Sequence, residues 1–211
     1  MKLIELLNKT ENCPVFSTGF LLSAGTKPEN VRLQISRWVK SGKLVQLRRG
    51  LYSVAKPYCK VLPHPFLVAN NIKKASYISL QSALHYYNII PEHVPGVTSI
   101  TTGRPGQVST TFGEFEYRHV KHLWFHGYKK IEIVQGQFVL IATPEKALLD
   151  LMYLTPFADC PGYLQELRLQ NLKQLNLDNL SQIISQAKMP KLKRVEKWLI
   201  KHIENNKYEE L

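Results

Sequence analysis

The chain has 211 residues, enough for one large domain or two small ones, and 44% of them are hydrophobic, a share that argues against disorder. No run of about 18 apolar residues occurs, which argues against a membrane-spanning helix and a membrane partner. The formal net charge of +12 favours a polyanionic partner.

The cysteines and the N-terminal segment bear on the cellular compartment. Cys13, Cys59 and Cys160 are widely spaced and form no CxxC pair, as expected for free thiols in a reducing environment. The N-terminal segment has a short apolar run interrupted by Glu5 and no small-residue cleavage site, so we expect no signal peptide. A cytoplasmic protein is therefore expected.

Three helices are predicted in the N-terminal part of the chain, which is also its most basic part: residues 1–60 hold 11 lysines and arginines against three acidic residues. Apolar residues three and four apart in LIELLNKT predict the first helix, and Ser17 is placed to cap a brief second one. Thr26 and Glu29 form the Ser/Thr-x-x-Glu pattern of a capping box. A third helix should therefore run from about residue 27 to residue 41 and end at Gly42.

The third helix has an apolar side and a polar side. A rotation of about 100° per residue places four apolar residues on one side, namely Val31, Ile35, Trp38 and Val39. The other side carries Leu33 and four polar residues that are candidates for contacts with base edges or phosphates, namely Asn30, Ser36, Arg37 and Lys40. Any amphipathic helix has a polar side, so the helix alone does not identify a function.

A β-hairpin is predicted after the third helix. KLVQL and LYSV are strand-like, and the turn between them contains Gly50, as a bulged hairpin turn requires. Helix, helix, basic helix and hairpin is the order of a winged helix-turn-helix, whose third helix enters the major groove. Arg48 and Arg49 at the hairpin tip, with Lys43 before it, are then candidates for contact with phosphate or the minor groove.

A linker with three prolines, AKPYCKVLPHPF, predicts a boundary between a winged-helix domain, residues 1–56, and a second domain, residues 57–211. In the second domain, SYISLQSALHYYNII predicts a helix capped by Ser79, and GVTSITTGR predicts a buried strand. TTFGEFEYRHV predicts a strand bent at Gly113, and IEIVQGQFVLI a hairpin that turns at QGQ. We therefore expect an α+β fold with a small, mainly antiparallel sheet and a helical C-terminal tail.

The helical part begins at ATPEKALLDLMYL, where Thr143 is placed to cap and Pro144 to occupy the first helical position. The last fifty residues predict three more helices, with breaks at Asn176 and Pro190. The final basic helix could contact DNA or anionic lipid. Its apolar residues have the spacing of a core stripe, which favours packing with solvated lysines.

The PEKALLD segment groups residues that a nuclease could use. Glu145 and Lys146 are adjacent at the start of the helix, where a carboxylate suits the helix dipole. Asp150, five positions after Glu145, is expected to point away from both. We therefore interpret the segment as a helix start followed by a solvent-facing side.

Two further segments carry candidate ligands. His119, His122 and His126 have the spacing of metal ligands, but the residues around them predict a strand and a turn, so no metal site is expected. TTGRPGQ lacks the GK[ST] ending of a phosphate loop, although Arg104 is placed to contact an anion or RNA. No nucleophile elbow occurs, and we expect neither catalytic residues nor a cofactor.

Five stretches, in chain order, carry a resemblance to a known family: FSTGFLLSAG, ISRWVKSGKLVQLRRGLYSV, YISLQSALHYYNII, ITTGR and FVLIATPEKALLDLMYL. Over about residues 1–155 the chain resembles the AbiEi-type antitoxins of bacterial type IV toxin–antitoxin systems, which act in phage abortive infection. The resemblance implies a winged helix that represses its own operon, with DNA contacts at Arg37, Lys40, Arg48 and Arg49. It also implies a C-terminal domain that counteracts a nucleotidyltransferase toxin, without implying direct contact with that toxin.

We therefore expect a DNA-binding antitoxin and autorepressor whose partners are operator double-stranded DNA and a cognate nucleotidyltransferase toxin. Two copies on inverted repeats would be a natural arrangement. Two alternatives stay open: a stand-alone winged-helix regulator whose C-terminal domain senses a ligand or dimerises, and an enzyme tethered to DNA. A neighbouring gene for a nucleotidyltransferase-like protein would favour the antitoxin over the lone regulator.

Overall fold

The structure is a computed structural model that describes residues 2–22 and 27–209. The chain separates into two compact units. The first comprises the described residues up to Lys74, together with the hairpin ends 109–113 and 132–139, and the remaining described residues form the second. Among the residues described, no helix has the length and apolar character needed to cross a membrane.

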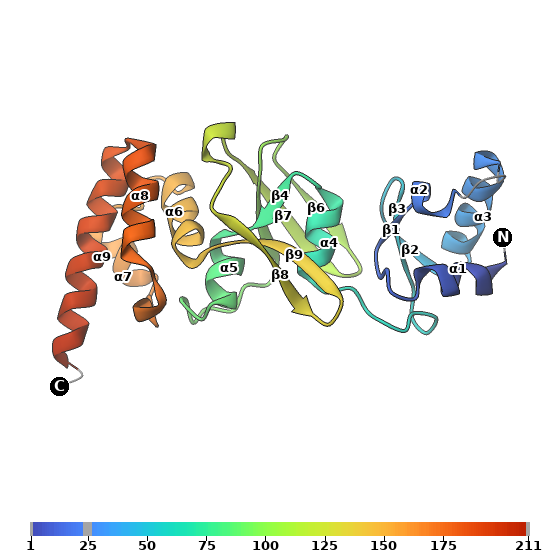
Figure 1. The fold of residues 1–211 in the computed structure, drawn as a ribbon, viewed down its shortest axis with the longest axis horizontal. Coiled ribbons are helices and arrows are strands. Elements are labelled where there is room, and N and C mark those ends of the chain that lie inside the picture. Colours follow the sequence, from blue (N-terminus) through green and yellow to red (C-terminus); the bar gives the residue numbers. More distant parts are fainter. Residues whose placement is uncertain (1, 23–26, 210–211) are drawn as a thin grey trace. The chain divides into compact units, whose positions relative to one another are not determined.

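The first unit contains a winged helix-turn-helix. In chain order its elements are α1 (Leu3–Thr10), β1 (Phe16–Ser17), α2 (Thr18–Leu21), α3 (Pro28–Lys40), β2 (Leu44–Arg48), β3 (Leu51–Val54) and α4 (Pro65–Ile72) (Figure 1). Strand β3 lies between β1 and β2 and is antiparallel to both. The predicted order of helices and hairpin in this part of the chain is confirmed.

Local signals set the limits of these helices. The Ser17 hydroxyl accepts a hydrogen bond from the Phe20 N–H at 3.3 Å, so it caps α2 as predicted. After the end of α3, Gly42 adopts a φ of +68°, the left-handed conformation of a helix stop. Thr26, the first residue of the predicted capping box, lies outside the described residues, and Lys27 directly precedes α3 in the structure.

A hydrophobic core joins α1, α2 and α3 to the three-stranded sheet. Its buried side chains are Leu6, Phe16, Leu21, Val31, Ile35, Trp38, Leu44 and Val54. Three of them form the predicted apolar stripe of α3, whereas the fourth predicted member, Val39, is only partly buried at the edge of this core. Burial of that stripe fixes the rotation of α3 and leaves its polar side in solvent.

The segment that follows β3 is held by hydrogen bonds within the first unit. The buried side chain of Gln137 accepts a hydrogen bond from the His64 N–H at 2.8 Å and donates one to the Leu62 carbonyl at 2.9 Å. His64 in turn caps α4, because its Nδ1 accepts a hydrogen bond from the Phe66 N–H at 3.2 Å. The proline-rich segment therefore has defined contacts.

Six later strands form one mixed sheet in the order β6-β7-β5-β4-β9-β8. They are β4 (Ser76–Ile78), β5 (Val97–Thr101), β6 (Gly106–Thr110), β7 (Gly113–His119), β8 (Tyr128–Val134) and β9 (Gln137–Ala142). Strand β4 pairs antiparallel with β5, whereas the β4–β9 and β5–β7 pairs are parallel. The mixed α and β composition and the predicted hairpin turn at Gly136 are confirmed.

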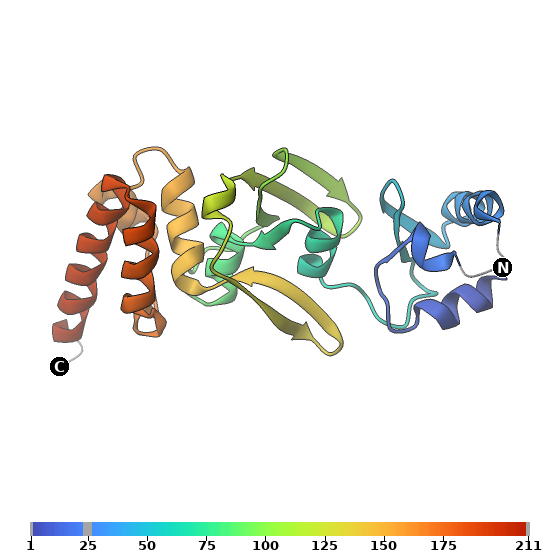
Figure 2. The ribbon, with the colours of Figure 1, turned by 45° about the horizontal axis from the view of Figure 1, so that its top comes forward.

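The helices of the second unit are α5 (Leu80–Tyr86), η1 (His122–Trp124), α6 (Pro144–Leu154), α7 (Pro161–Glu166), η2 (Leu172–Gln174), α8 (Leu177–Ala187) and α9 (Pro190–Glu209). Helix α6 packs against α5, α8 and α9, and Figures 1 and 2 both show it between α5 and the α8–α9 pair. Thr143 caps α6 by accepting the Lys146 N–H at 3.3 Å, as predicted. The predicted breaks are confirmed, since Asn176 caps α8 and Pro190 begins α9.

The last helix, α9, has a buried apolar stripe. Leu192, Val195 and Leu199 are completely buried, which confirms three of the four predicted core positions of this basic segment, whereas the fourth, Ile203, is only half-buried. Lys193, Lys197 and other cations on the same helix are exposed. Lys193 and Lys197 therefore face solvent, while the apolar side stabilises the helical end of the unit.

Candidate nucleic-acid interface and buried charged cluster

The polar side of α3 is a row of exposed side chains. Asn30, Ser36, Arg37 and Lys40 are all exposed, on a helix whose other side is held by the core. Hydroxyl, amide, guanidinium and ammonium groups can donate hydrogen bonds to phosphates and to base edges. The four predicted DNA-contact residues of α3 are therefore all accessible to a ligand.

The hairpin tip carries two adjacent arginines. Arg48 ends β2, Arg49 lies in the turn, and both are exposed, while Lys43 before β2 is half-buried. The register shifts between Gln46 and Arg48, which is the irregularity expected of a bulged turn. Gly50 closes the turn with a φ of +80°, a conformation that favours glycine.

The tip is anchored by its backbone. The N–H of Thr18, at the start of α2, donates a hydrogen bond to the Gly50 carbonyl at 3.0 Å. Ser17 of β1 pairs with Leu51 of β3, and this pairing holds the same end of the hairpin against β1. The two arginines therefore project from a fixed turn.

The cations of this region are available to a ligand. Within the described part of the chain, the side chains of Arg37, Lys40, Arg48 and Arg49 have no hydrogen bond or ion pair. Exposed, unpaired guanidinium groups are well suited to binding phosphate, because one group can donate two parallel hydrogen bonds.

Two further residues of α3 are exposed near the predicted DNA contacts. Arg32 is exposed on the flank of the helix, and Leu33 is 54% exposed on its polar side. Positive charge in the third helix was the signal that could have identified Arg32. Helical periodicity places Leu33 on the polar side, but its apolar side chain offers no hydrogen bond by which a sequence pattern would select it as a DNA contact.

Arg104 and the three histidines lie in the second unit. Arg104 is exposed in the loop between β5 and β6. His119 ends β7, His122 begins the 3₁₀ helix η1, where a strand and a turn were predicted, and His126 follows this helix. Among the described residues, no group of three histidine, cysteine or acidic side chains is arranged to hold a metal ion.

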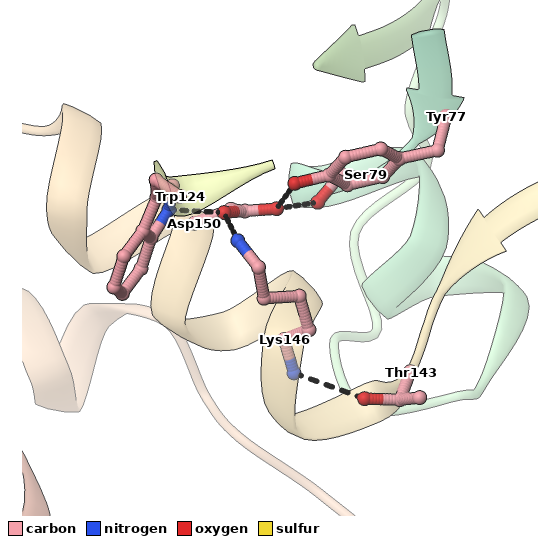
Figure 3. Close-up of polar contacts among 6 residues, drawn as sticks. All are labelled: Tyr77, Ser79, Trp124, Thr143, Lys146 and Asp150. Atoms are coloured by element: carbon pink, nitrogen blue, oxygen red, sulfur yellow. Dashed lines mark hydrogen bonds and ion pairs between the residues drawn. The ribbon is translucent and has the colours of Figure 1, made fainter. Parts of the chain in front are cut away.

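A charged cluster is buried where α6 meets β4, α5 and η1. Figure 3 shows Asp150 of α6 reached from one side by Trp124 and from the other by Tyr77 and Ser79. Its Oδ2 accepts hydrogen bonds from the Tyr77 hydroxyl at 2.9 Å and the Ser79 hydroxyl at 2.7 Å. Its Oδ1 accepts one from the Trp124 indole N–H at 2.6 Å and forms an ion pair with Lys146.

The cluster corrects the prediction for PEKALLD. Lys146 and Asp150 are completely buried and Glu145 is 4% exposed, so this side of α6 does not face solvent. The spacing that matters is Lys146 to Asp150, four positions apart and therefore on the same side of the helix. Ser79 is corrected too: its hydroxyl donates to Asp150 and makes no capping hydrogen bond to α5.

Burial and charge set the protonation of the cluster. Burial lowers the pKa of Lys146, and the carboxylate of Asp150 opposes that change. Burial and the negative charge of Asp150 raise the pKa of the Tyr77 hydroxyl, which keeps it protonated as a donor. The Lys146 ammonium also lies 4.2 Å from the centre of the Trp124 ring, within the range of a cation–π interaction.

Glu145 joins α6 to α8. Its Oε1 accepts the Asn176 N–H at 2.7 Å, and its Oε2 accepts a hydrogen bond from the Asn179 side chain at 3.2 Å. A carboxylate at the start of α8 is favourable for the dipole of that helix. The three charged residues of the segment are therefore buried and hydrogen-bonded, as expected of groups that hold the unit together.

The order of elements, the basic exposed side of α3 and the basic hairpin tip define a DNA-binding protein of the winged-helix class. Residues 11–55 match the family model of the AbiEi antitoxins, described as transcriptional regulators. The resemblance to AbiEi-type antitoxins is thereby confirmed over residues 11–55, which include most of the winged helix. A search of curated proteins found no match to the chain.

Proposed function

We propose that the protein is a type IV antitoxin that represses its own operon through its winged helix and counteracts a nucleotidyltransferase toxin through residues 57–211. In this proposal α3 enters the major groove of operator DNA and the hairpin tip contacts the backbone or the minor groove. The contacts come from Asn30, Ser36, Arg37, Lys40, Lys43, Arg48 and Arg49. The proposed function is binding and regulation without catalysis, in keeping with an antitoxin regulator family.

One observation carries the proposal for DNA. Exposed cations without partners among the described residues occur on two consecutive elements, α3 and the β2–β3 tip, inside the segment that matches the antitoxin regulators. Exposed arginine and lysine on a winged helix supply the electrostatic part of DNA affinity by releasing counterions. The same charges scattered over the surface would not form a continuous positive site for DNA.

Binding to the promoter of its own operon tests this part. Fluorescence anisotropy of a labelled promoter fragment should show specific binding by the full-length protein, and R48A/R49A should weaken it at least tenfold. The matched control, K193A/K197A, removes two exposed positive charges from α9 and should bind as the wild type does. Equal loss in both variants would indicate only a general charge effect and contradict the assignment of the tip.

Toxin neutralisation is tested in cells by co-expression with the adjacent gene. From an inducible promoter, the wild-type protein should restore growth that the adjacent gene product arrests. R48A/R49A should restore growth equally well while failing to repress a reporter fused to the native promoter. Loss of growth rescue in this variant would contradict the separation of the two activities, and absence of rescue by the wild type would contradict the antitoxin role.

Two finer points belong to the same proposal. Two copies bind inverted repeats, so DNase footprints should cover two half-sites about one helical turn apart. Arg104 contacts an anion or RNA, and R104A should then reduce growth rescue without changing promoter binding. A single-half-site footprint would contradict the first point, and unchanged rescue the second.

The second candidate function is a stand-alone regulator that senses a small molecule. The observation in its favour is a pocket of about 530 Å³ in the second unit, lined among others by Gln81, Ile90 and Phe115. That volume is within the range of small-molecule sites. A metabolite that raises the melting temperature of the full chain and changes promoter affinity, with no toxic neighbouring gene, would favour this function instead.

A further inference from the structure

Leu33 is an apolar side chain exposed on the polar side of α3. It is 54% exposed, and it lies on the side of the helix opposite the buried residues Val31 and Ile35. The core of the first unit is complete without it, because the buried residues of α3 already close the helix against the rest of that core. More than half of the Leu33 surface is therefore left in solvent.

The neighbours of Leu33 along α3 are all polar. On a helix surface its neighbours are the residues three and four positions away, which are Glu29, Asn30, Ser36 and Arg37. All four are exposed. On α3 Leu33 is thus an exposed apolar residue among polar neighbours, and two of these neighbours, Asn30 and Arg37, belong to the proposed DNA contacts.

The chemistry of the major groove limits what such a point can meet. Base edges there present hydrogen-bond donors and acceptors, with one apolar group, the C5 methyl of thymine. A leucine placed over the edge of a G·C pair would cover polar atoms without offering them a partner, which is unfavourable. Over a thymine methyl it buries apolar surface on both sides.

We propose that Leu33 is a specificity-determining residue that reads the C5 methyl group of a thymine in each half-site. The inference rests on the proposed function, because it requires α3 to lie in the major groove. Leu33 selects by attraction to the methyl group and by exclusion of pairs whose polar edge it would cover. Arg37 and Asn30 supply the hydrogen bonds beside it.

Replacement of thymine by uracil tests the inference, because uracil lacks only the C5 methyl and keeps the same pairing and the same O4 acceptor. The promoter fragment of the protein's own gene is prepared with thymine or with uracil throughout. The wild-type protein should bind uracil DNA about fourfold more weakly for each methyl group that Leu33 covers. L33A should bind thymine DNA more weakly than the wild type and lose most of the difference between the two fragments.

Two controls keep the result interpretable. E29Q, which changes an exposed neighbour of Leu33 outside the proposed DNA contacts, should retain the full difference between thymine and uracil DNA. Titrations at low salt keep L33A bound through phosphate contacts, and thermal melting checks that this exposed position leaves folding unchanged.

The outcomes distinguish a wrong role for Leu33 from a wrong proposed function. If the wild type binds both fragments equally, or if L33A retains the wild-type difference, the role of Leu33 is wrong while DNA binding stands. If the wild type fails to bind the promoter fragment in either form, the proposed function itself is wrong.

Discussion

Lys146 and Asp150, one turn apart on α6, form an ion pair in which both side chains are completely buried. Asp150→Asn would leave the Lys146 ammonium buried without a charged partner. We expect the free energy of unfolding to fall by about 3–5 kcal/mol. Urea denaturation followed by circular dichroism measures the change.

A matched control separates burial from charge. Arg118→Gln removes an exposed ion pair with Glu116 and should cost less than about 1 kcal/mol. Adding Lys146→Met to Asp150→Asn should recover part of the stability, because no unpaired charge remains. A loss for Asp150→Asn as small as that of Arg118→Gln would show that the cluster contributes little.

Gly127 should tolerate alanine poorly because it packs against Lys146. Its φ is +74°, and an added Cβ would lie 3.0 Å from the Lys146 Cγ and Cδ. Gly136 has the same φ with nothing within 4 Å of its added Cβ. Both alanine variants should lose about 1–2 kcal/mol from the left-handed conformation. Gly127→Ala should lose about 1–3 kcal/mol more, from overpacking, and equal melting temperatures for the two variants would refute this.

His64 should make the stability of the first unit depend on pH. Burial lowers the pKa of His64, and its Nδ1 must be unprotonated to accept the Phe66 N–H at the start of α4. Because the folded protein then binds this proton more weakly than the unfolded chain does, His64 favours folding above about pH 6.5. That contribution is lost as the pH falls below 6.5 toward the lower pKa of the folded state.

The measurement for His64 is a series of melting temperatures between about pH 7.5 and 5.5. His64→Asn keeps a capping acceptor that does not titrate, so its melting temperature should fall less across this range. Burial and the positive charge of Lys146 also lower the pKa of His126, so part of the dependence should persist. An unchanged pH dependence in His64→Asn would contradict the prediction.

The cations of the winged helix should differ in their effects on DNA binding. Arg48→Ala should weaken binding to all sequences and reduce the slope of log affinity against log salt by about 1, as loss of a phosphate contact does. Arg37→Ala should instead relax sequence preference by about 1–3 kcal/mol if it removes a bidentate base contact. Gel shifts on promoter and scrambled DNA measure both effects. If both variants bind the two DNAs as the wild type does, the roles of these residues are wrongly assigned.

Much of the first unit was predictable because its signals are local. Ser17 caps α2, Gly42 follows the end of α3, and Gly50 closes the hairpin, each within a few residues of the feature that it determines. The polar side of α3 followed from helical periodicity, since burial of Trp38 and its neighbours fixes which side faces solvent.

The buried cluster was not predictable in the same way. Lys146 and Asp150 have the spacing of an exposed helical ion pair, and the sequence offers no local sign that they are buried. The partners that make burial favourable, Trp124 and Tyr77, come from 26 and 73 positions away along the chain.

The winged helix, its basic exposed side and its hairpin tip can therefore be predicted from local sequence, because caps, glycines and periodicity act over a few residues. The tertiary structure alone decided that Glu145, Lys146 and Asp150 are interior groups. A charged side chain is stable inside a protein only when distant segments bring donors and an opposite charge to it, and that meeting is a property of the fold.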